Sequence, residues 1–177
     1  MSYANLFLTL AIVAFVAPPA AQDAQTKSRQ GAKYQLALAK TYHQQSHDHV
    51  RMLQKYAALG DKVPAEVVTE HAAAIRYNTD ATKRAYGRLV KSAGDDAELA
   101  KRVEEMQARL DKVSATLKEL EANTSQQKAD SKAVAARAKE ITQQLRSNHV
   151  DLGRIDNDFY DSDSDSYYET GEGHFVD

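Results

Sequence analysis

Apolar residues recur at alternating spacings of three and four along most of the chain, a pattern typical of amphipathic helices. Four segments carry it, and we expect helices at about 33–59, 64–93, 95–122 and 126–155. Because their connections are short, neighbouring helices should be antiparallel. The pattern therefore predicts an all-α fold, an antiparallel up-down-up-down four-helix bundle. Two long hairpins that complete their core by dimerising remain an alternative, since regular heptads also suit coiled coils.

The third segment has the cleanest apolar series of the four. The third reads Leu99, Val103, Met106, Leu110, Val113, Leu117 and Leu120. The fourth reads Val134, Ala138, Ile141, Leu145, Asn148, Leu152 and Ile155. We expect both series to face the core of the bundle.

Local signals mark where these helices begin and end. Gly60 and Gly94 should stop the first and second helices, because glycine accepts the left-handed conformation found there. Pro64 should open the second helix from its first position. Asp95 followed by Glu98 has the spacing of a capping box at the start of the third helix.

The amino-terminal segment has the pattern of an export signal. Its apolar run, 6–17, is followed by two prolines and several alanines, and it is shorter than the roughly 20 apolar residues that span a bilayer. We expect a cleaved signal peptide at 1–22, a linker at 23–32, and a secreted or periplasmic protein without stable membrane insertion. An uncleaved anchor or a buried helix is the alternative.

Composition excludes several classes of function. The 177 residues include no Cys, so disulfides, thiol nucleophiles and Cys-ligated metal centres are ruled out. No glycine-rich phosphate loop or nucleophile elbow is present. Residues 151–177 carry a net charge of −8 and the rest +6, but the bases form no stripe interleaved with aromatics. We therefore expect neither nucleic-acid binding nor enzymatic activity.

Four of the six histidines lie in the first two predicted helices. His43, His47 and His49 are close together, and His71 falls on the apolar series of the second helix. Because His43 and His47 are one turn apart, both could bind one cation. His149 and His174 lie too far along the chain for the sequence to place them.

The hairpin between the first two helices gives a register for these residues. A turn near 61–62 places Met52 opposite His71, with His49 one turn away, and His43 opposite Asp80. Imidazole nitrogens and a thioether sulfur suit copper, and imidazoles also suit zinc. The predicted set of transition-metal ligands is therefore His43, His47, His49, Met52 and His71. The alternative is that the histidines only pack in the bundle.

The predicted architecture resembles that of ferritin-like secreted four-helix bundles. Di-iron and di-manganese members of that group place Glu-x-x-His on two helices, together with further inward-facing Glu residues. No Glu-x-x-His occurs in this chain, and four glutamates fall off the apolar series: Glu66, Glu70, Glu104 and Glu105. The resemblance implies the bundle without the oxidase site, and a degenerate redox enzyme is kept as a second alternative.

The acidic segment 161–172 resembles an EF-hand calcium loop, whose pattern is D-x-[DN]-x-[DN]-G-x5-E. Its calcium ligands would be Asp161, Asp163, Asp165, Tyr167, Glu169 and Glu172. Ser166 replaces the turn glycine and no helix follows the segment, so we expect weak binding. Otherwise 156–177 is a mostly disordered acidic tail, or it recognises a partner through Tyr160, Tyr167 and Tyr168.

The sequence as a whole predicts an exported, non-enzymatic helical bundle that binds divalent cations through the histidine face, the acidic tail or both. The rival interpretation is a structural or protein-interaction bundle without metal. Both interpretations leave room for a homodimer or for another protein partner.

Overall fold

The computed structural model describes the backbone of residues 19–94, 96–124 and 128–168, with side chains described within 26–159. In these ranges it contains four helices and two short strands: α1 Pro19–Ala58, β1 Lys62–Pro64, α2 Ala65–Ala93, α3 Ala97–Ala122, β2 Lys128–Asp130 and α4 Ser131–Tyr168. The predicted all-α fold is confirmed, and the two strands are an addition to it.

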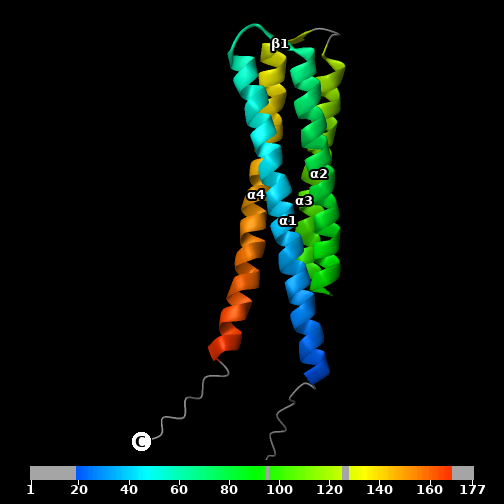
Figure 1. The fold of residues 1–177 in the computed structure, drawn as a ribbon, viewed down its shortest axis with the longest axis vertical. Coiled ribbons are helices and arrows are strands. Elements are labelled where there is room, and N and C mark those ends of the chain that lie inside the picture. Colours follow the sequence, from blue (N-terminus) through cyan, green and yellow to red (C-terminus); the bar gives the residue numbers. More distant parts are fainter. Residues whose placement is uncertain (1–18, 95, 125–127, 169–177) are drawn as a thin grey trace, which may run out of the picture.

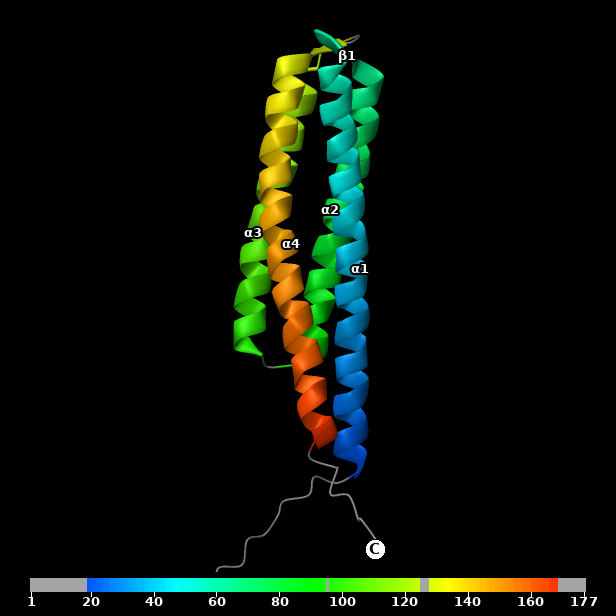
Figure 2. The same cartoon turned by 90° about the vertical axis from the view of Figure 1, so that its left-hand side faces the viewer.

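The helices lie side by side as a four-helix bundle (Figure 1). α1 and α3 run toward the end that carries the strands, and α2 and α4 run back. Each helix packs against the next one in sequence, and α4 also packs against α1, so the four helices enclose one core. At the end away from the strands, α1 and α4 extend beyond the turn between α2 and α3 (Figure 2).

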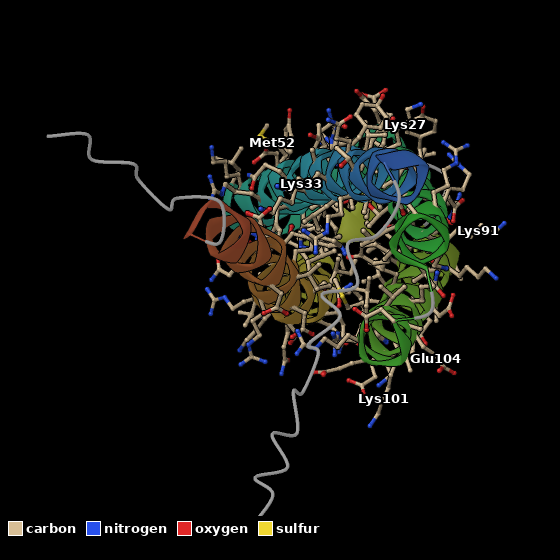
Figure 3. The ribbon with its side chains drawn as sticks, turned by 90° about the horizontal axis from the view of Figure 1, so that it is seen from below. Lys27, Lys33, Met52, Lys91, Lys101 and Glu104 are labelled. Atoms are coloured by element: carbon tan, nitrogen blue, oxygen red, sulfur yellow. The ribbon has the colours of Figure 1, made fainter. Side chains whose placement is uncertain are left out.

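The core consists of the apolar series that the sequence predicts. All seven members of the α3 series and all seven of the α4 series are buried. Burial of one leucine side chain stabilises a fold by roughly 1.5–3 kcal/mol, so these stripes hold the helices together. The glutamates that fall off the series, Glu66, Glu70, Glu104 and Glu105, are all exposed. Figure 3, which looks along the bundle from the end away from the strands, shows Lys91, Lys101 and Glu104 on its outer surface.

α1 begins at Pro19, so the predicted linker at 23–32 is wrong. That segment is rich in Ala, Gln and Lys, which favour helix. Ala32 is fully buried in the core, and the hydroxyl of Ser28 donates a hydrogen bond to the carbonyl of Ser92 in α2. The start of α1 is therefore part of the bundle. Residues 1–18, which hold most of the predicted signal peptide, lie outside the described residues.

α4 continues past its predicted end at 155 to Tyr168. Asp156 forms an ion pair with Lys40, and Asp158 forms one with Arg102 at 2.7 Å. These contacts make residues 156–159 part of the bundle rather than the start of a tail. Positions 161–168 of the predicted calcium loop are helical, instead of curling around an ion, and 169–172 lie outside the described residues.

The two strands pair as a short antiparallel ribbon that joins the α1–α2 and α3–α4 connections. Val63 pairs with Ala129, and both side chains are buried. The backbone N–H of Ser131 donates to the carbonyl of Asp61 at 3.2 Å. Three-residue strands are too short to show an alternating pattern, which is why the sequence does not predict them. The ribbon fixes how far one helical hairpin can slide along the other.

The helix ends follow the predicted signals in part. Gly94 has a φ of 76° and ends α2 as expected. Gly60 does not take a positive φ, so its predicted role is wrong. The N-cap of α3 is Asp96 rather than Asp95, because the Asp96 carboxylate accepts the Leu99 N–H at 2.9 Å. Pro64 stands just before α2 with an extended ψ of 136°, one residue earlier than predicted.

Within the part of the chain that is described, no helix combines the length and apolar character needed to cross a membrane.

Candidate functional site

His49 and His71 form a pair between α1 and α2. Their Nδ1 atoms are 3.0 Å apart, a hydrogen-bond distance at which one ring donates and the other accepts. The ring of Tyr56 lies 6.0 Å from that of His71. Both histidines are half-buried, so the pair faces the core on one side and remains accessible from solvent on the other. We call these two residues the α1–α2 pair.

The register predicted for this hairpin places His49 near His71, as the structure does, but it is wrong about Met52. His71 meets His49 directly rather than lying opposite Met52. Met52 is 37% exposed, and Figure 3 shows it on the outer side of α1. Leu53, the next residue along, is the one that enters the core. The predicted sulfur ligand is therefore not placed against the two nitrogens.

The other histidines of α1 face α4. The ring centres of His43 and His47 are 5.1 Å apart, and that of His149 lies 6.1 Å from His43 and 6.5 Å from His47. We call these three residues the α1–α4 cluster. The expectation that His43 lies opposite Asp80 is wrong, because its Nε2 is bonded to the carbonyl of Leu145 on α4 at 2.8 Å.

Burial favours the neutral form of three of these imidazoles, those of His43, His47 and His71. The pKa of His43 is lowered to about 4, first by loss of hydration and then by His47, with His149 a smaller contribution. Loss of hydration is also the main reason for the lowered pKa of His47, followed by the nearby His149. For His71 the lowered pKa comes from burial first and from His49 second. A neutral imidazole has a lone pair, which is the form that binds metal ions.

A buried polar network lies beside the α1–α4 cluster. The amide of Asn148, which is fully buried, donates to the carbonyl of Met106 at 3.0 Å and accepts from Arg109. Arg109 also pairs with Asp151. The hydroxyl of Tyr86 is buried nearby without a hydrogen-bond partner, and burial raises its pKa. This network sets the position of α4 next to His149.

Only part of this arrangement can be predicted from the sequence. A polar residue inside an apolar series, as His43 and Asn148 both are, was the available signal for the buried groups. His149 sits one residue outside the α4 series, and only the packing of α4 against α1 brings it to His43 and His47. Arg109 lies outside the apolar series, where a charged residue is expected to be solvated.

Among the residues that the structure describes, no group of three or more His, Asp or Glu side chains is arranged so that it could hold a metal ion as it stands.

Comparisons with known proteins found no matching family model, curated protein or solved structure. The chemistry of the histidines themselves therefore has to indicate the function.

Proposed function

We propose that this chain is an exported, non-enzymatic helical bundle that binds a copper ion at the α1–α2 pair. The observation that carries the proposal is the 3.0 Å approach of two Nδ1 atoms from different helices. Imidazole nitrogens are suitable ligands for copper. One ion would take the place of the proton between the two Nδ1 atoms, and the donor ring would carry that proton on its Nε2 instead, so that both rings stay neutral. The apolar run 6–17 followed by small residues supports export.

The setting of the pair favours binding over catalysis. Its two nitrogens come from adjacent helices with a fixed ribbon at one end, so they are held without a loop that has to order. The glutamates that would supply a ferritin-like oxidase site are exposed. Two protein ligands on a half-exposed face leave open positions, which suits an ion that is taken up and passed on rather than locked in.

The proposal is tested by copper(I) competition between the full chain and a chromogenic chelator, under anaerobic conditions. We expect the double variant His49→Gln, His71→Gln to weaken binding at this site by more than about 100-fold, since both ligands are removed. His174→Gln is the matched control, because it makes the same chemical change outside the described residues. Unchanged affinity in the double variant would contradict the proposal and favour a bundle that binds protein partners instead.

Met52 provides a further distinction. Because Met52 points outward, Met52→Leu should leave copper(I) affinity within about threefold of the parent. A loss as large as that of the double variant would show that the thioether swings in to bind copper, as the sequence pattern predicts.

A further inference from the structure

The α1–α4 cluster contains a buried nitrogen with no partner. His43 is 1% exposed, and its Nδ1 has no hydrogen-bond partner in the described structure. Its other ring nitrogen, Nε2, lies 2.8 Å from the Leu145 carbonyl oxygen, which can only accept. Nε2 must therefore donate, so the proton of the neutral ring is on Nε2 and Nδ1 presents a bare lone pair. Buried polar atoms are normally paired, and an exception calls for an explanation.

The hydrogen bond of His43 is the kind that orients metal ligands. A histidine that binds a metal through one nitrogen usually donates its other N–H to a carbonyl or carboxylate, which fixes the ring and its tautomer. His47 follows four residues later on the same face of α1, the spacing at which two histidines of one helix bind a single zinc ion. His149 adds a third imidazole from α4.

We infer that His43, His47 and His149 form a second metal site, for a zinc-class ion, that joins α1 to α4. This site shares no ligand with the α1–α2 pair and does not rest on the function proposed for it. Three imidazole nitrogens with a fourth position left to water match the open form of tetrahedral zinc coordination. A set made only of imidazoles, without carboxylates, favours zinc over calcium or magnesium.

The ring separations allow this site to form with a small movement. Two imidazoles that share an ion at a tetrahedral angle have ring centres about 5 Å apart, taking a metal–nitrogen distance of about 2.0 Å. His43 and His47 already stand at 5.1 Å. His149, at 6.1 and 6.5 Å, has to come about 1–1.5 Å closer, and its ring, now stacked on that of His43, has to turn. Because His149 is exposed, its ring can turn without repacking the core.

A hollow in the surface gives the ion a way in. A depression of about 550 Å³ lies between α1 and α4, and His149 stands in its wall with Gln44 and Leu152. His149 is the member of the cluster that lines this depression, and its ring centre lies 6.1 Å from that of His43 and 6.5 Å from that of His47. The hollow therefore brings solvent to the exposed member of the cluster, His149.

The affinity test uses the full chain in the His49→Gln, His71→Gln background, so that the α1–α2 pair cannot contribute. Zn²⁺ is added to the metal-free protein, and its affinity and the melting temperature are measured. We expect one equivalent to bind and to raise the melting temperature, because the ion links two helices in the folded state only. No binding in this background would overturn the inference and leave the copper proposal untouched.

His149→Gln is the decisive variant, because an exposed position does not threaten folding. It should lower Zn²⁺ affinity at least about tenfold and reduce the rise in melting temperature. Val150→Gln, the next residue and 49% exposed, is the matched control and should leave both values unchanged. Equal Zn²⁺ affinity in His149→Gln and the parent background would overturn the inference.

Nitrogen-15 spectra of the histidine rings test the mechanism separately. In the metal-free protein, His43 should show the tautomer with the proton on Nε2. Saturating Zn²⁺ should move the Nδ1 resonance of His43 away from its lone-pair position, while Nε2 keeps its proton. A lone-pair Nδ1 signal that persists at saturation would show that His43 is not a ligand.

Discussion

The two sides of α1 use the same residue type in opposite ways. Toward α4, His43 is fully buried with one nitrogen bonded to a main-chain carbonyl and the other unpaired. Toward α2, His49 is half-buried and shares a proton with His71 in a bond that water can reach. The buried ring of His43 is therefore held in place and costly to protonate, whereas the α1–α2 pair is adaptable.

The difference follows from position around one helix. At 100° per residue, His47 lies about 40° to one side of His43 and His49 about 120° to the other. His47 is thus directed toward α4 and His49 toward α2. Three histidines within seven residues of sequence consequently serve two different interfaces, and burial rather than residue type decides how each one behaves.

The largest expected effect is on stability against acid. His43 has an unfolded pKa of 6.5 and a folded pKa of about 4, so the unfolded chain binds more protons between these values. The free energy of unfolding should fall as the pH is lowered from 6.5 to 4, by roughly 3 kcal/mol from His43 alone. Urea unfolding of the metal-free protein at a series of pH values measures this loss.

Single variants show which side of α1 causes the loss of stability at low pH. His43→Gln should remove most of the pH dependence between 6.5 and 4, because glutamine does not titrate. His71→Gln should remove only a smaller part, since His71 is less buried than His43. Equal pH profiles for the parent and His43→Gln would show that the two sides of α1 do not differ in this way.

The sequence specifies the four helices because their apolar series are long and regular. It does not specify the outer ends of α1 and α4. There, helix depends on contacts made by polar residues such as Ser28 and Asp156, which carry no periodic signal. The ribbon is likewise set by tertiary pairing, since its strands are too short to show alternation.

The next largest effect concerns how α4 is held. Asn148→Ala removes a donor to the Met106 carbonyl and an acceptor for Arg109, and should cost about 2–3 kcal/mol because each partner loses a hydrogen bond inside the bundle. Ser147→Ala is the matched control, since this exposed hydroxyl bonds only its own helix and its loss should cost less than about 0.5 kcal/mol. Urea unfolding at pH 7 compares the two. Equal costs would mean that the buried network does not position α4.

The candidate sites show which contacts a single sequence can predict. The α1–α2 pair lies within one hairpin, so its register follows from the position of the turn, to within about one helical turn. The α1–α4 cluster joins residues 43 and 149, and its register depends on the whole bundle. The sequence predicts His43 and His47 as candidate ligands, but it offers no means to add His149.

The smallest expected effect is on the α1–α2 pair itself. Removing the His49–His71 hydrogen bond exposes groups that water can reach, so a double-mutant cycle with His49→Ala and His71→Ala should give a coupling of only about 0.5–1 kcal/mol. Each single change also gains some helix propensity from alanine, which the cycle cancels. Urea unfolding of the metal-free variants at pH 7 gives the four values. A coupling above about 2 kcal/mol would mean that the His49–His71 hydrogen bond is as shielded from water as the contacts of His43. The contrast between the two sides of α1 would then come from the shapes of the two interfaces and not from access to water.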